Sequence, residues 1–178
     1  MKLTLIRHAK VEESYIGKYN GHNDIGLSKE GLLQAKKLAK KVQEKRFDKV
    51  YCSDLTRAKE TLKAFNLKSE TIFTQEIREK SWGVHEGMSF EEIEETGIKY
   101  KNFNQWIEAL DGERTREYRE RIKKYFYEVI AKDEAKNILV VTHAGVIKML
   151  LSIHNKLSLE EAFAIKLDYA SFIELELN

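Results

Sequence analysis

Short apolar runs alternate along the chain with longer segments whose apolar residues recur at helical spacing. β-Branched and aliphatic runs predict strands at 3–6, 49–52, 71–74 and 137–142. The run at 137–142 is continuous and apolar, which is typical of a central strand buried on both faces. Apolar residues interleaved with two glutamates over 171–177 predict an edge strand.

The helical segments lie between these strands. Apolar spacing predicts helices at 29–45, 113–132 and 146–151, and a further helix carrying Leu55 to Phe65. Ser89 with Glu92 three residues later forms a capping-box pattern for a short helix over 89–95.

Capping residues precede two of the longer helices. Ser28 is a suitable N-cap for the helix at 29–45, and Ser53 or Asp54 could cap the helix that follows the second strand.

Two segments, 9–28 and 76–88, have no periodicity and are expected to be loops. Because strands alternate with helices through most of the chain, the pattern predicts an α/β fold. We expect a three-layer α/β/α sandwich around a mostly parallel sheet with an antiparallel edge strand. No linker or internal repeat divides residues 1–178, so we expect a single domain.

Composition narrows the class of protein further. The 178 residues are 42% hydrophobic and 34% charged, with a net charge of +2, as in ordinary globular proteins. The basic residues Lys40, Lys41, Lys45 and Arg46 fall on a predicted helix among polar residues, so a nucleic-acid partner is not expected. No apolar run is long enough for a membrane span. The single cysteine, Cys52, is compatible with a cytoplasmic location.

Basic residues follow three of the predicted strands. Arg7 and His8 follow the first strand, Arg57 follows the second, and His143 follows the strand at 137–142. Ligands of such sheets bind beyond the carboxyl ends of the strands, so these side chains are expected to converge. Glu79 lies in the irregular segment after the third strand.

This set of side chains has the chemistry of a phosphoryl site. Arginine binds phosphate oxygens through a planar fork, and a neutral histidine can act as a nucleophile. A carboxylic acid such as Glu79 could protonate a leaving alkoxide. No carboxylate cluster for Mg²⁺ follows the predicted strands, so neither a metal nor a cofactor is expected. Each residue alone has a plainer explanation as a surface or packing residue, and only their combination points to an anion site.

Five blocks of the sequence carry a family resemblance. They are LIRHA at 5–9, GHNDIGLSKEGLLQA at 21–35, YCSDLTRAKET at 51–61, IREKSWGVHEG at 77–87 and VVTHAGVI at 140–147. In this order they resemble the signature blocks of the histidine phosphatase superfamily, the phosphoglycerate mutase-like enzymes. The resemblance implies that family's three-layer fold and a phosphatase that works through a phosphohistidine.

The resemblance also implies roles for individual residues. His8 would be the nucleophile and Glu79 the proton donor, while Arg7, Arg57 and His143 would bind the phosphoryl group. The backbone amide near Ala144 would add a donor to phosphate. Ser14 stands where many members have a phosphate-binding Asn, so that contact is open.

The substrate is less clearly indicated, apart from its being a small phosphorylated metabolite. The segment 15–24 resembles a stretch of α-ribazole phosphatases, which suggests α-ribazole-5′-phosphate. The expected substrate contacts are Tyr19, Asn20, His22, Lys80 and Trp82. The aromatic residues Phe103 and Trp106 have two interpretations: they could contact the substrate, or they could belong to a core packed under a lid.

Three alternatives remain open at this stage. They are a cofactor-dependent phosphoglycerate mutase, a phosphohistidine phosphatase and a non-catalytic phosphoryl-binding protein. The sequence carries no signal for oligomeric state.

Overall fold

A computed structural model describes residues 1–177 and contains one sheet of five strands in the order β3-β2-β4-β1-β5. The strands are β1 (Lys2–Arg7), β2 (Lys49–Ser53), β3 (Glu70–Thr74), β4 (Asn137–Thr142) and β5 (Phe172–Glu176). Four of them are parallel, and β5 is antiparallel to β1 with Thr4 opposite Glu174. All five predicted strands are therefore confirmed.

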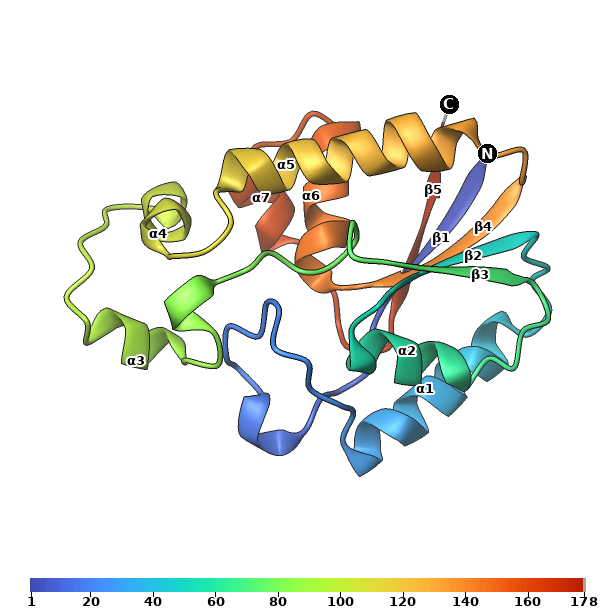
Figure 1. Ribbon diagram of the computed structural model, residues 1–178, viewed down its shortest axis with the longest axis horizontal. Helices are drawn as coiled ribbons and strands as arrows, with labels where there is room; N and C mark the ends of the chain where they lie inside the picture. The colour runs from blue at the N-terminus through green and yellow to red at the C-terminus, as the bar shows by residue number, and fades with distance from the viewer. Residues whose placement is uncertain (178) are drawn as a thin grey trace.

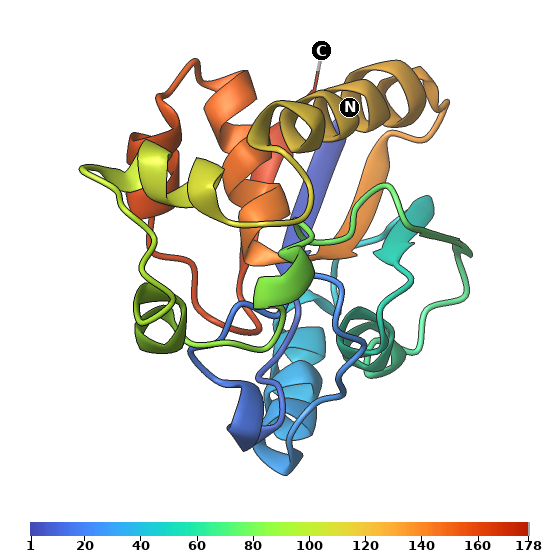
Figure 2. The same ribbon diagram turned by 60° about the vertical axis from the view of Figure 1, so that its left-hand side comes forward.

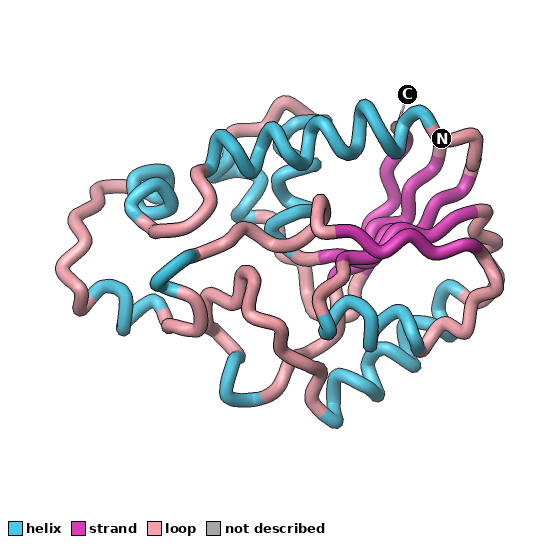
Figure 3. Tube along the Cα trace, viewed as in Figure 1, coloured by secondary structure: helices cyan, strands magenta, loops and turns pink. Residues whose placement is uncertain are grey.

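Helices cover both faces of the sheet. The α-helices are α1 (Lys29–Val42), α2 (Thr56–Lys63), α3 (Phe90–Glu94), α4 (Phe103–Ala109), α5 (Thr115–Lys124), α6 (Ala144–His154) and α7 (Leu159–Ala164). Figure 1 shows α1 and α2 on one side of the sheet and α5 and α6 on the other. Figure 3 shows the strongly twisted sheet between these two layers. The predicted three-layer α/β/α sandwich is confirmed.

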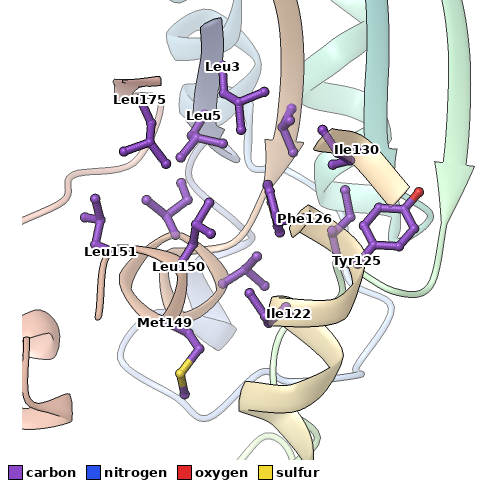
Figure 4. Packing of buried hydrophobic residues seen from close by; sticks show 14 of the residues in the cluster. Leu3, Leu5, Ile122, Tyr125, Phe126, Ile130, Met149, Leu150, Leu151 and Leu175 are labelled. Atoms are coloured by element: carbon purple, nitrogen blue, oxygen red, sulfur yellow. The ribbon is translucent and has the colours of Figure 1, made fainter. Parts of the chain in front are cut away.

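The larger part of the core lies between the sheet and the α5–α6 layer. Leu3 and Leu5 of β1 meet Ile122 of α5 and Leu150 of α6, and all four side chains are fully buried (Figure 4). On the opposite face Leu38 and Val42 of α1 pack with residues of β2 and β4. Burial of both faces explains why the β4 run is continuously apolar rather than alternating.

The end of α1 and the cap of α2 differ from the sequence prediction. The helix α1 begins after its predicted N-cap, Ser28, whose side chain accepts from the Gly31 amide, but it ends at Val42 rather than at residue 45. The predicted cap of α2 is wrong: Leu55 occupies the N-cap position and makes no side-chain cap hydrogen bond. Asp54 instead pairs with Arg78, the residue before Glu79. Two N–H groups of Arg78 donate to the two carboxylate oxygens of Asp54, at 2.7 and 2.6 Å.

The predicted helix at 113–132 is not a continuous α-helix. After α5, the chain forms a π-helix over Tyr125–Val129 and a 3₁₀ turn over Ile130–Lys132. The wider turn buries the consecutive residues Tyr125 and Phe126 and still places Ile130 in the core. Apolar spacing alone does not distinguish this arrangement from a regular helix.

A small second apolar cluster lies beyond the carboxyl ends of the strands. It contains Trp82, Ile93, Trp106 and Ile107, with Phe103 packed at its edge. The capping box predicted for Ser89 and Glu92 is present at the start of α3. Phe103 and Trp106 of α4 thus pack in this apolar cluster, as one of the two sequence interpretations expected. Within residues 1–177, no helix is long and apolar enough to cross a membrane.

Candidate active site

A pocket of about 170 Å³ opens beyond the carboxyl ends of β1 and β4. It is lined by Arg7, His8, Val11, Lys18, Tyr19, Asn20, Arg57, Glu79, Trp82, Ala144 and Tyr169. Figure 2 shows the loop after β1, the 3₁₀ turn Gly83–His85 and the start of α6 gathered at this end of the sheet. Segments far apart in the sequence therefore meet here, as the strand-end argument predicted.

His8 lies at the base of the pocket with 7% of its surface exposed. Its Nδ1 is 2.8 Å from the Ala9 carbonyl oxygen, which can only accept, so Nδ1 carries the proton. In a neutral ring Nε2 then bears the free lone pair. Burial, together with the charges of Arg57 and Arg7, holds the pKa of His8 well below its usual value. His8 is thus a neutral imidazole with Nε2 available for attack.

Arg7 is held from two sides, and its buried Nε has no partner within residues 1–177. Its Nη1 donates to the Leu167 carbonyl, and its guanidinium carbon lies 3.8 Å from the centroid of the Tyr169 ring. Burial lowers the pKa of Arg7, but an arginine remains charged. Its Nε is buried and has no hydrogen-bond partner among the described residues. Such an unpaired donor beside a pocket fits an anion.

Arg57 on α2 is almost fully buried and is bound mainly to the loop after β1. Its Nη1 donates to the Asn23 carbonyl at 2.6 Å, and its Nη2 donates to the Asn20 and Gly21 carbonyls at 2.7 Å. Its Nε donates to Nδ1 of His143 at 3.3 Å. Four of its five N–H groups are therefore used, and one hydrogen on Nη1 remains for a ligand.

His143 is fully buried between Arg57 and Ser53 and does not line the pocket. Because Nδ1 accepts from Arg57, the proton is on Nε2, which lies 2.9 Å from Ser53 Oγ. Burial is the largest cause that lowers the pKa of His143 well below its usual value, followed by the charge of Arg57. Its ring centroid is 5.2 Å from that of His8. In this geometry His143 contacts Arg57 and stands beside the base of the pocket.

Glu79 also lines the pocket and is held by three donors. Oε1 accepts from the Tyr118 hydroxyl at 2.9 Å and from the Lys80 amide at 3.0 Å. Oε2 accepts from the Gly145 amide at 2.9 Å, in the first turn of α6. The carboxyl group is thereby fixed at a pocket that His8 also lines.

The remaining predicted contacts separate into two groups. Ala144, Tyr19, Asn20 and Trp82 line the pocket. Three others lie outside it. Ser14 is exposed on the 3₁₀ turn Glu13–Tyr15, and exposed His22 is 3.1 Å from the Glu79 carbonyl oxygen. Lys80 is buried with its ammonium 4.3 Å from the centroid of the Trp82 ring.

Val11, Lys18 and Tyr169 line the pocket but were not among the predicted site residues. Tyr169 follows α7 and carries no motif, so only the fold brings it under Arg7. Lys18 lies in the segment already expected to contact substrate, where a basic residue in a loop rich in Tyr and Asn was an available signal. Over the part of the chain that is described, no group of three His, Cys, Asp or Glu side chains is placed to hold a metal ion.

Comparison with known proteins defines the class. Residues 3–178 match the model of the histidine phosphatase superfamily (branch 1), and the chain belongs to this family. Its relatives include phosphoserine phosphatase 1 of Hydrogenobacter thermophilus, 31% identical over 97% of this chain and 84% of that protein. The adenosylcobalamin/alpha-ribazole phosphatase of Salmonella typhimurium is 27% identical over 85% of this chain and 78% of its own length.

The solved structures support the same class. The alpha-ribazole phosphatase from Shigella flexneri superposes with a TM-score of 0.88 at 26% identity, covering 100% of this chain and 91% of that one. The fold is thus phosphoglycerate mutase-like, and the chain is a phosphatase of this superfamily.

Proposed function

We propose that the protein hydrolyses a small phosphomonoester through a phosphohistidine formed on His8. The observation that carries this proposal is the state of His8: a neutral ring whose protonated Nδ1 is bound to a carbonyl, in a pocket that Arg7 and Arg57 also line. A nucleophile that needs no deprotonation, beside two fixed positive charges, suits phosphoryl transfer.

The reaction has two transfers. Nε2 of His8 attacks phosphorus, the ester P–O bond breaks, and the leaving alkoxide takes a proton from Glu79. Water then attacks the phosphohistidine, Glu79 takes back a proton, and inorganic phosphate leaves with His8 restored. The unused Nε of Arg7 and the remaining N–H of Arg57 bind the phosphoryl oxygens during both steps. No step in this scheme uses a metal.

His143 acts in this proposal at the base of the phosphoryl site. Its hydrogen bond to Arg57 orients that guanidinium group, and its ring stands beside His8. Ala144 adds the start of α6, whose dipole favours an anion.

For the substrate we propose α-ribazole-5′-phosphate first. Tyr19 and Trp82 line the pocket with their rings in an edge-to-face arrangement, 5.1 Å between centroids. An aromatic wall of this kind suits the base of a nucleoside-like ester. Relatives named for this substrate are consistent with the choice.

A second candidate is an ester with an additional negative charge, such as phosphoserine. Lys18 lines the same pocket, and it forms no ion pair with an acidic side chain within residues 1–177. Its ammonium group would suit the carboxylate of such a substrate. A relative named phosphoserine phosphatase 1 is consistent with this candidate.

A substrate panel separates the two candidates. We expect one of the two esters to exceed p-nitrophenyl phosphate in kcat/KM. Lys18→Gln should reduce kcat/KM for phosphoserine about tenfold, as expected for loss of a charge-assisted contact, and leave α-ribazole-5′-phosphate nearly unchanged. Preference for neither ester would reject both substrate proposals.

The chemistry itself is tested with p-nitrophenyl phosphate. His8→Ala should lose at least about 10³-fold in kcat, since the covalent route disappears. His154→Ala is the matched control, because His154 lies at the C-terminal end of α6 and does not line the pocket, and it should keep most of the activity. Phosphoglycerate mutase activity is measured with the same preparations, and a mutase rate above the phosphatase rate would overturn the assignment as a hydrolase.

A further inference from the structure

The hydroxyl of Tyr118 is an unexplained polar group beneath the proposed acid. Tyr118 lies on α5, is 1% exposed and is surrounded by the apolar core between the sheet and α6. A phenylalanine would fill almost the same volume there without a buried hydroxyl to satisfy. The hydroxyl meets one partner, Oε1 of Glu79, at 2.9 Å.

The direction of this hydrogen bond is defined. Burial and the nearby charge of Glu79 raise the pKa of Tyr118 well above its usual value, so the hydroxyl keeps its proton. Tyr118 therefore donates and Oε1 accepts. The Lys80 amide also donates to Oε1, which occupies both of its lone pairs.

The two oxygens of Glu79 consequently differ. Oε2 accepts a single hydrogen bond, from the Gly145 amide, and keeps one lone pair free. Only that position is open to a proton that could be exchanged with a ligand. A carboxyl group with two equivalent oxygens would instead need to rotate into a productive orientation, at a cost in rate.

We propose that Tyr118 is a positioning residue, whose hydroxyl holds Glu79 so that Oε2 is the oxygen that gives and takes the proton. This inference rests on the proposed function, in which Glu79 protonates the leaving group. Tyr118 touches neither the phosphoryl group nor the pocket, and it acts through Glu79 alone.

Other groups also act on Glu79 and stay in place when Tyr118 changes. The cations are Arg7 after β1, Arg57 on α2, Lys80 beside it and Lys148 on α6. Glu113 and Arg121 are the other charged residues that act on Tyr118 itself. Since none of these depends on the Tyr118 hydroxyl, removing it isolates one hydrogen bond.

The test is Tyr118→Phe, measured as kcat/KM with esters of different leaving groups. An alkyl phosphate needs the proton of Glu79, so its kcat/KM should fall about tenfold, the factor for one hydrogen bond to a charged group. With p-nitrophenyl phosphate, whose leaving group needs no proton, the change should stay below about twofold. Equal losses for both esters would overturn the proposal, because a general structural defect affects both.

The matched control is Tyr127→Phe. Tyr127 follows α5 on the same helical segment, and its hydroxyl is 3.1 Å from Nδ1 of His154, away from the pocket. This variant should retain wild-type kcat/KM values for both esters. The same losses in Tyr127→Phe as in Tyr118→Phe would assign them to the fold of this segment.

A double variant distinguishes a failure of this inference from a failure of the proposed function on which it rests. If Tyr118 acts only through Glu79, Tyr118→Phe should cost less than about twofold in a Glu79→Gln background. A further tenfold loss there would overturn the positioning role. If Glu79→Gln alone shows no preference between leaving groups, it is the assignment of Glu79 as the acid that fails.

Discussion

At the scale of single residues, the site depends on which nitrogen of His8 is protonated. The sequence indicated a histidine nucleophile, but it could not predict the tautomer, because this follows from the carbonyl of the next residue, Ala9, folding back to Nδ1. It also could not predict that three of the four cationic or histidine side chains reach the pocket while His143 is covered by Arg57.

A titration of His8 tests this state directly. Because its pKa lies well below 6.5, the ring should stay neutral from pH 8 to pH 5.5, and its Cε1–H NMR resonance should not move over that range. The resonance is assigned by its absence from His8→Gln. A titration midpoint near the ordinary histidine value would contradict the proposed neutral nucleophile.

At the scale of elements, strand ends were predictable and loop contacts were not. The pattern that predicted β1 and β4 was sufficient to place Arg7, His8 and His143 at one edge of a sheet. Lys18 and Tyr169 reach the pocket from irregular segments, whose paths depend on packing rather than on periodicity. Ser14 and His22 were expected to contact the ligand but do not line the pocket, because they too lie in an irregular segment.

The start of α6 offers a test of how a helix places the acid. A Cβ on Gly145 would overlap Oε1 of Glu79 and push the carboxyl group from its position. Alanine is otherwise favoured in a helix by about 0.5–1 kcal/mol, so Gly145→Ala should not lower the melting temperature.

We expect Gly145→Ala to reduce kcat/KM for an alkyl phosphate by about 10²-fold, in the range for loss of a general acid, with a smaller loss for p-nitrophenyl phosphate. Steady-state kinetics on the two esters and a thermal melt are the measurements. Full activity toward the alkyl ester would mean that Glu79 is not held by the α6 amide.

At the scale of the whole molecule, the sequence predicted the architecture well because burial on both faces of the sheet leaves a strong pattern. The small apolar cluster of Trp82, Ile93 and Trp106 was less predictable, since these residues follow no regular spacing along the sequence. The break in the helix after α5 was also hidden, because a π-turn changes the apolar spacing by only one residue.

The buried histidines link the stability of the fold to pH. His8 and His143 both have pKa values well below 6.5 when folded and close to 6.5 when unfolded. Below about pH 6.5 the unfolded chain binds more protons than the folded one, so stability falls as pH falls. Each histidine can contribute up to about 1.4 kcal/mol per pH unit.

Urea unfolding at pH 7 and pH 5 measures this linkage. The urea midpoint of the wild type should be lower at pH 5 than at pH 7. The difference should be smaller in His8→Gln, which removes one of the two histidines. An equal drop in both proteins would show that His8 does not contribute.

The central claim is that His8 carries the phosphoryl group, and trapping that intermediate tests it most directly. The protein is mixed with a phosphorylated substrate, quenched in alkali, digested and examined by mass spectrometry. We predict a base-stable, acid-labile phosphoryl group on the peptide that contains His8, which is absent from His8→Ala. An unmodified His8 peptide, together with full turnover by His8→Ala, would contradict the account.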